Sequence, residues 1–258
     1  MRYAMGVFVG PASATAFDEA ALRRGVGSVR HPLAQALLAL TFTTGLVDAV
    51  SYLGLGRVFT ANMTGNVVLL GFGIAGAGGL PVVAPVVSLV SFLVGAGAGG
   101  VLVKRMHQRH PALAARALGI EVSLIAVAAV LGAATTVRPE NASAYLVIAL
   151  IASAMGVRNA AVRRFAVPDL TTTVLTLTLT ALAAESPFTG GSGKDSIRRL
   201  SAVAVMLAGA VAGALLLKTS LWVPLALAAS LAAATGVLYV PAAIRLGGPP
   251  TRTPTPRS

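Results

Sequence analysis

The chain has 258 residues, of which 56% are hydrophobic and 11% charged, and its mean hydropathy is +0.83. A soluble domain carries about 25% charged residues, so this composition excludes an ordinary soluble protein and predicts an all-α integral membrane protein. The net charge of +12 lies between and beyond the apolar stretches, and we interpret it as a signature of membrane topology rather than of nucleic-acid binding. With no cysteine, and with three histidines in or beside basic stretches, no metal or other cofactor is expected.

Eight apolar stretches follow an N-terminal segment, residues 1–29, which we expect to be a disordered cytoplasmic arm. A spanning helix needs about 20 mostly apolar residues, and all but the second and sixth stretches meet this requirement. Those two contain the polar runs VFTANMTGN at 58–66 and VPDLTTTVLTLTLT at 167–180. The Pro-rich basic tail, residues 244–258, is expected to be disordered. The eight stretches are 31–55, 58–78, 82–103, 114–137, 142–161, 165–184, 197–217 and 220–241.

An internal repeat relates the first four stretches to the last four. The third ends in GAGAGGVLVK at 95–104 and the seventh in GAVAGALLLK at 209–218, an offset of 114. An offset near 112 places the second stretch on the sixth, and 111 places the first on the fifth. We therefore predict two related membrane repeats, 30–137 and 138–243. The matched residues include Thr60 with Thr172, Thr64 with Thr176, Asn66 with Thr178, Gly45 with Gly156, and Asp48 with Asn159.

Two glycine pairs occupy matched places in the third and seventh stretches. Gly95 and Gly99, and again Gly209 and Gly213, form the GxxxG pattern that lets the backbones of membrane helices approach closely. The pattern predicts that these two helices pack against each other or against the polar segments. We interpret it as scaffold.

The basic residues distinguish two topologies, because Lys and Arg concentrate on the cytoplasmic side of a membrane. If all eight stretches cross, the loop KRMHQRH at 104–110 and the pair Arg163 and Arg164 face outward, against this rule. If the second and sixth stretches enter and leave on one side, both basic groups lie inside with the two termini. We favour six spanning helices plus two re-entrant or broken segments, which makes the two halves inverted relative to each other. Eight crossings are the alternative.

Inverted repeats with discontinuous helices are typical of transporters, whose solute site lies near the membrane midplane between the repeats. Irregular polar chain survives at that depth only inside protein or along a cavity. The run FTANMTGN at 59–66 is therefore the strongest candidate for a site. In the alternative interpretation, its polar side chains only hydrogen-bond neighbouring helices.

Ionisable residues inside spans are costly and mark functional sites by default. Asp48 lies in the first span as either a functional or a structural carboxylate, and we expect it to approach Arg158 across the repeat axis. Glu121 lies near the predicted start of the fourth span, where we expect an interfacial carboxylate. The predicted substrate-binding or translocation residues are Asp48, Asn62, Thr64, Gly65, Asn66, Arg158, Asn159, Thr172 and Thr176.

The string GLVDAVSYLGLGRVFTANMTGNVVLLG at 45–71 resembles the hallmark of the YoaK-like family of bacterial membrane proteins, domain of unknown function 1275. The string GVRNAAVRRFAVPDLTTTVLTLTLTALA at 156–183 is similar to its second-half signature, and the resemblance covers roughly residues 30–240. It implies a multi-pass protein of the bacterial inner membrane and names no substrate. The first half has a Thr-Gly pair that is missing after Thr176, so any site is expected to be one-sided.

Two classes of function follow. The first is a secondary transporter or permease for a small solute or ion, embedded in the bilayer with both termini cytoplasmic. The second is a non-transporting accessory or interaction protein. An enzyme is not expected, because no nucleophile and base pair is evident, and no nucleotide-binding loop is present, so any coupling must come from an ion gradient. The sequence leaves the oligomeric state open.

Overall fold

The computed structural model describes residues 32–106, 110–165, 175–186, 189–190 and 196–246. The arm at 1–29, most of the tail at 244–258, and Thr172 lie outside these ranges. Every regular element in the described part is helical. These elements are α2 (Pro32–Gly54), α3 (Met63–Ile74), η1 (Ala77–Gly79), α4 (Val83–Arg105), α5 (His110–Ala134), α6 (Ala142–Phe165), α7 (Leu175–Ala184), α8 (Ser196–Leu217) and α9 (Trp222–Leu246).

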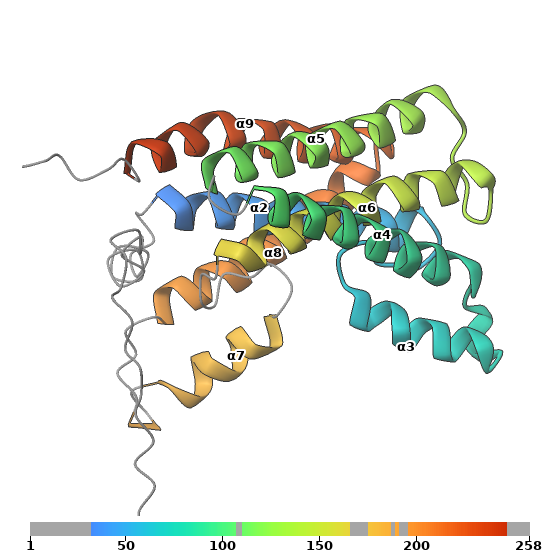
Figure 1. Cartoon of the computed structure of the whole chain (residues 1–258). Coiled ribbons are helices and arrows are strands. Elements are labelled where there is room, and N and C mark those ends of the chain that lie inside the picture. Colours follow the sequence, from blue (N-terminus) through green and yellow to red (C-terminus); the bar gives the residue numbers. More distant parts are fainter. Residues whose placement is uncertain (1–31, 107–109, 166–174, 187–188, 191–195, 247–258) are drawn as a thin grey trace, which may run out of the picture.

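The helices are arranged in three layers (Figure 1). In the middle layer α2 packs against α8 and α6 packs against α4. The pair α5 and α9 covers one side, where α5 contacts α6 and α9 contacts α2. The short helices α3 and α7 lie on the other side, each against its own neighbour, α4 or α8.

Five helices are long and apolar enough to cross a membrane: α2, α4, α5, α6 and α8. The protein is therefore an all-α membrane protein. The last of the six predicted spans, 220–241, corresponds to α9. This helix has 25 residues, and its side chains are described as far as Leu238. The two stretches predicted to be weak contain helices of only 12 and 10 residues. At about 1.5 Å per residue such helices are shorter than the roughly 30 Å hydrocarbon core.

The central helices α2 and α6 are also the least apolar of these five. In their most apolar 18-residue segments, α2 and α6 have mean hydropathies of 1.5 and 1.6, and 78% and 61% of these segments are buried. The corresponding segments of α4 and α8 have mean hydropathies of 2.2 and 2.4, and only 17% of each is buried. The core is built where the two central helices meet α5 and α9, around fully buried residues such as Leu46, Ile148, Met155 and Leu225. Helices shielded from lipid tolerate polar residues, so the candidate site lies on α2 and α6.

Glycines set the close packing in the middle layer, and they do so twice. A Cβ on Gly45 of α2 would lie 2.3 Å from the Met206 carbonyl oxygen of α8, and a Cβ on Gly156 of α6 would lie 2.2 Å from that of Phe92 on α4. These contacts recur at the offsets of 111 and 114 found in the sequence. The first helix of each half thus packs against the third helix of the other half.

The GxxxG glycines of α4 and α8 lie in the same two helix interfaces, on the facing helices. A Cβ on Gly95 would lie 2.1 Å from the Ser153 carbonyl oxygen, and one on Gly209 would lie 2.2 Å from that of Phe42. The prediction that these glycines pack α4 against α8 or against the polar segments was therefore wrong, because they face α6 and α2 instead.

The two ends of the bundle differ in charge. One end, which we call the sparse end, brings together the end of α2 and the starts of α4 and α6, as well as the end of α8 and the start of α9. Its charged residues are Arg57, Arg138, Glu140 and Lys218. The opposite, basic end carries the other termini of these helices (Figure 1). Its charged residues with described side chains are Lys104, Arg105, Arg116, Arg163, Arg198, Arg199 and Glu185.

Candidate functional site

The run FTANMTGN connects α2 to α3 and is irregular up to its middle. Helix α2 stops at Gly54, and Gly56 has a φ of 106°, a conformation that favours glycine. The chain then passes back along α2 with Thr60 and Ala61 buried. Helix α3 begins at Met63, where the Asn62 side chain accepts a hydrogen bond from the Gly65 N–H at 3.1 Å. We call residues 59–62 the irregular segment.

Asp48 holds the irregular segment against α2. Its Oδ1 accepts hydrogen bonds from the backbone N–H groups of Thr60, at 3.3 Å, and Ala61, at 3.0 Å. The Thr60 hydroxyl lies 3.3 Å from the Ser51 hydroxyl, one turn further along the helix. The Asp48 residue is 8% exposed, and both backbone bonds meet the same oxygen, which leaves Oδ2 outside them. The buried carboxylate therefore satisfies backbone groups that have no helix or sheet partner.

Asn66 holds the same segment from the other side. Its Oδ1 accepts from the Phe59 N–H at 2.8 Å, and its Nδ2 donates to the Phe59 carbonyl at 2.6 Å and to the Ser88 hydroxyl at 3.0 Å. The Ser88 hydroxyl donates to the Phe59 carbonyl at 2.7 Å. The fully buried Asn66 amide thus pairs with one residue's backbone much as a neighbouring strand would.

Asn66→Asp is expected to destabilise the protein although it barely changes the volume of the side chain. The variant keeps an acceptor for the Phe59 N–H but directs a second carboxylate oxygen at the Phe59 carbonyl, a buried mismatch worth about 1 to 3 kcal/mol. Unfolding of purified protein by SDS in mixed micelles, followed by circular dichroism, measures the effect. Asn62→Asp is the matched control, because Asn62 is exposed and Asp caps a helix as well as Asn does. Equal effects of the two changes would contradict this role of Asn66.

The remaining first-half candidates have simpler roles. A Cβ on Gly65 would lie 2.9 Å from the Phe59 ring, so glycine lets this ring pack against the start of α3. Asn62 caps α3, and Thr64 is exposed in the first turn of α3. The structure thus brings Asp48, Asn66 and Gly65 together around the irregular segment and leaves Asn62 and Thr64 at its surface.

Arg158 lies in a separate buried cluster. All five of its N–H groups have acceptors. Nε donates to Glu121 Oε2 at 2.8 Å, Nη2 also pairs with Glu121 Oε1, and the remaining bonds of 2.8 to 2.9 Å go to the Thr43 hydroxyl, the Thr44 hydroxyl and the Leu40 carbonyl. Arg158 is 2% exposed and Glu121 is fully buried. The cluster joins α6, α5 and α2.

Two predictions were therefore wrong. Glu121 is not an interfacial carboxylate, because it forms a buried ion pair. Arg158 does not take Asp48 as its ion-pair partner, since its donors are occupied by Glu121 and by groups of α2. Thr44, Asp48 and Ser51 follow one another on one face of α2 at helical spacing, so the two clusters adjoin along a polar stripe.

The remaining second-half candidates, Asn159, Thr172 and Thr176, lie outside the hydrogen bonds given above for the two clusters. The Asn159 side chain donates to the Met155 carbonyl at 2.8 Å, one turn back in α6. Thr176 is exposed at the start of α7, and Thr172 lies outside the described residues. One repeat match is visible in the burial, since Asn66 is the buried residue of α3 and its predicted counterpart Thr178 is the buried residue of α7.

Several site residues were missed by the sequence analysis: Thr43, Thr44, Ser51, Ser88 and Glu121 as the partner of Arg158. The signal for two of them, Thr44 and Ser51, was the string TTGLVDAVS at 43–51, in which these hydroxyls stand at helical spacing from Asp48. For Ser88 no local signal exists. Among the described residues, no group of three or more His, Cys, Asp or Glu side chains is placed to hold a metal ion.

Comparisons with known proteins agree with the resemblance seen in the sequence. A model of the family described as "Protein of unknown function (DUF1275)" matches residues 36–238. The chain is 34% identical over 147 residues to the UPF0700 transmembrane protein YoaK of Bacillus subtilis (strain 168). The matched region covers 57% of this chain and 64% of that relative. No solved structure matches significantly.

Proposed function

The chain belongs to the DUF1275 family of proteins of unknown function, and from this starting point we propose that it is a secondary transporter or permease for a small solute. The observation that carries the proposal is the polar stripe of α2, where the Arg158 cluster and Asp48 adjoin inside a membrane protein. Buried ionisable groups at such depth are costly and mark solute or ion paths by default. We propose transport without any chemistry on the solute and without a role for nucleic acid.

The proposed topology has six spanning helices, α2, α4, α5, α6, α8 and α9, and two re-entrant segments that contain α3 and α7. Its support is that α2 ends and α4 begins at the same end of the bundle, where both line one cavity. Whatever lies between them therefore enters and leaves on one side. Since Lys and Arg are retained inside, we assign the basic end to the cytoplasm of a bacterium, together with both termini.

The two halves form an inverted repeat in this proposal. Between α2 and α6 lie two crossings, α4 and α5, so these equivalent helices run in opposite directions, as their courses in Figure 1 also indicate. The recurrent glycine contacts between α2 and α8 and between α6 and α4 support the two-fold relation. In transporters of this architecture the solute binds between the repeats, and one repeat moves relative to the other.

Within this proposal Asp48 is the coupling group. Its carboxylate binds the irregular segment through two backbone N–H groups, so protonation or cation binding at Asp48 weakens the hold on this segment. Binding or release of an ion at the Asp48 carboxylate thereby changes the position of a re-entrant segment. The ion gradient supplies the energy.

Asp48→Asn is expected to reduce flux at least tenfold while the protein stays folded. The test reconstitutes wild type and variant into proteoliposomes and measures uptake of radiolabelled amino acids, sugars and nucleosides under an imposed proton or sodium gradient. Glu185→Gln, which alters a 59% exposed carboxylate at the basic end, is the matched control. Wild-type flux in Asp48→Asn would remove Asp48 from the mechanism. The lack of any gradient-driven uptake or ion flux by wild type would contradict transport itself.

A non-transporting accessory role is the second candidate, and one observation favours it. Asp48, Asn66 and Arg158 all use hydrogen bonds to hold elements of this chain together, which is what purely structural polar residues do. The same flux measurement separates the two functions.

A further inference from the structure

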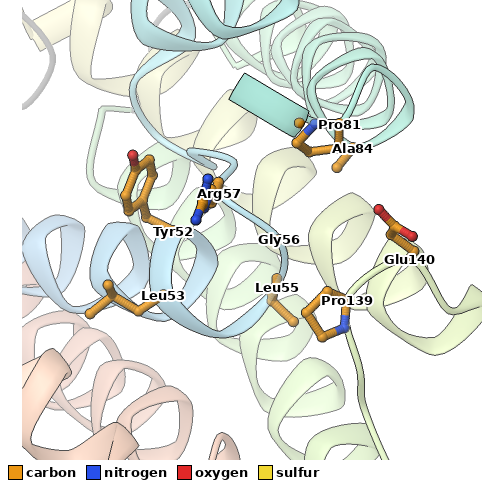
Figure 2. Close-up of a pocket in the computed structure, with 10 residues that line it drawn as sticks. Tyr52, Leu53, Leu55, Gly56, Arg57, Pro81, Ala84, Pro139 and Glu140 are labelled. Carbon is orange, nitrogen blue, oxygen red and sulfur yellow. The ribbon is translucent and has the colours of Figure 1, made fainter. Parts of the chain in front are cut away.

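A cavity of about 260 Å³ opens at the sparse end of the bundle (Figure 2). Its walls come from three segments: the end of α2, the connection into α4, and the connection from α5 to α6. The first two belong to the first half of the chain and the third links it to the second. Apolar surface is contributed by Pro81 and Pro139, so the cavity lies where the two halves meet and combines an apolar wall with charged groups.

The charged groups that line this cavity are one cation, Arg57, and one anion, Glu140. They come from different segments, Arg57 from the chain that follows α2 and Glu140 from the connection between α5 and α6 (Figure 2). Within the residues that the structure describes, neither side chain forms an ion pair or a side-chain hydrogen bond. Opposite charges held apart in one cavity can each take a complementary group of a ligand.

The backbone holds both residues in an unusual conformation. Arg57 has a φ of 55° and Glu140 a φ of 70°, and these are the non-glycine residues with positive φ in the described chain. Non-glycine residues in this conformation are strained, and such strain clusters at functional sites. A single exposed charged residue at a membrane surface needs no special explanation. Two residues of opposite charge that both have a strained backbone and both line one cavity suggest a binding site.

We propose that this cavity binds a small zwitterion, such as an α-amino acid, with its carboxylate at Arg57 and its ammonium group at Glu140. An apolar side group of the ligand then lies against Pro81 and Pro139. A simple anion, including a phosphate or an anionic lipid headgroup, is disfavoured by Glu140, and a simple cation is disfavoured by Arg57.

The cavity also contacts the candidate site. The Tyr52 ring lines the cavity and stacks on Phe59, with ring centroids 4.9 Å apart and an interplanar angle of 22°. Phe59 is the residue whose backbone is held by Asn66. A ligand in this cavity therefore lies next to the irregular segment. The further idea that a transported solute enters through this site rests on the proposed function.

The test measures binding to the purified full-length protein in detergent by isothermal titration calorimetry. The probes are L-alanine and L-leucine, with L-leucinamide as the matched cation and 4-methylpentanoate as the matched anion. We expect saturable binding of an amino acid and at least tenfold weaker binding of both single-charge analogues. Arg57→Gln and Glu140→Gln should each weaken amino-acid binding at least tenfold, Arg57→Lys should recover part of it, and Lys218→Gln, at the same end but outside the cavity, should change nothing.

Several outcomes would overturn the proposal: no saturable binding of either amino acid by folded protein, binding of leucinamide or 4-methylpentanoate as tight as that of leucine, or wild-type binding in both Gln variants. Circular dichroism establishes that each variant is folded. Because binding is measured without a gradient, a protein that binds but does not transport refutes the proposed function alone. Gradient-driven flux of other solutes without amino-acid binding refutes this site alone.

Discussion

Replacing Glu121 by glutamine is expected to lower the free energy of unfolding by about 3 to 5 kcal/mol, the usual cost of removing one partner of a buried ion pair. Glu121 is fully buried and Arg158 is 2% exposed, so the variant leaves a guanidinium without a counter-charge in the interior of a membrane protein. The hydroxyls of Thr43 and Thr44 remain as hydrogen-bond partners but carry no charge. SDS-induced unfolding in mixed micelles, followed by circular dichroism, measures the loss.

The double variant Glu121→Leu with Arg158→Met is the decisive control. Removing both charges leaves no uncompensated ion, and replacing a buried pair by apolar side chains is often neutral or stabilising. The double variant should therefore recover most of the stability. Glu185→Gln disrupts the exposed ion pair with Arg199 and should cost no more than about 1 kcal/mol. If Glu121→Gln were as mild as Glu185→Gln, the buried pair would not be an essential element of the fold.

The helical elements were predictable because membrane helices are defined by hydropathy. The predicted spans at 82–103, 142–161 and 197–217 correspond to α4, α6 and α8 with shifts of a few residues. The two short helices were predictable for the opposite reason, since the polar runs of 58–66 and 167–180 interrupt the apolar pattern. The partners of each helix were not predictable, because glycine patterns indicate close packing without naming the helix that is packed against.

The error over Glu121 has a specific origin. The predicted span began at residue 114, whereas α5 begins at His110, which places Glu121 eleven residues, or about 16 Å, along the helix. Both carboxylate oxygens of Glu121 meet Arg158 of α6 inside the bundle, a contact that the sequence of α5 alone does not reveal. The error over Arg158 is one of helical direction. Its neighbour Asn159 is the counterpart of Asp48, and a side chain one residue earlier points about 100° away around the helix, toward α5 and the threonines of α2.

The location of the polar site could be predicted from the sequence, but the hydrogen-bond partners within it could not. The run FTANMTGN contains polar groups that need protein or water around them, and Asn62 was in a position to cap a helix. One partner of Asn66, however, is Ser88, 22 residues away on α4, and that contact depends on how α3 folds back onto α4. Likewise, Asp48 meets Thr60 and Ala61 only because the chain reverses after Gly56.

Gly95→Ala and Gly209→Ala are each expected to destabilise the protein by about 1 to 3 kcal/mol, the usual cost of overpacking a close-packed contact. The added Cβ would lie 2.1 or 2.2 Å from a backbone carbonyl oxygen of the facing helix, which cannot turn aside as a flexible side chain can. Gly97→Ala is the matched control in the same helix as Gly95. A Cβ on Gly97 meets nothing within 4 Å, and alanine favours helix by about 0.8 to 1.0 kcal/mol over glycine.

The comparison between the two halves gives this prediction its weight. If α4 with α6 and α8 with α2 are equivalent interfaces, Gly95→Ala and Gly209→Ala should cost similar amounts, and their effects should add in the double variant within about 0.5 kcal/mol, as expected for independent sites. The same unfolding measurement decides the point. A large effect in one half alone, or an effect of Gly97→Ala as large as that of Gly95→Ala, would contradict the duplicated packing. Equal and additive costs would instead tie the offsets of 111 and 114 in the sequence to a duplicated energetic unit, the unit from which an inverted-repeat transporter is built.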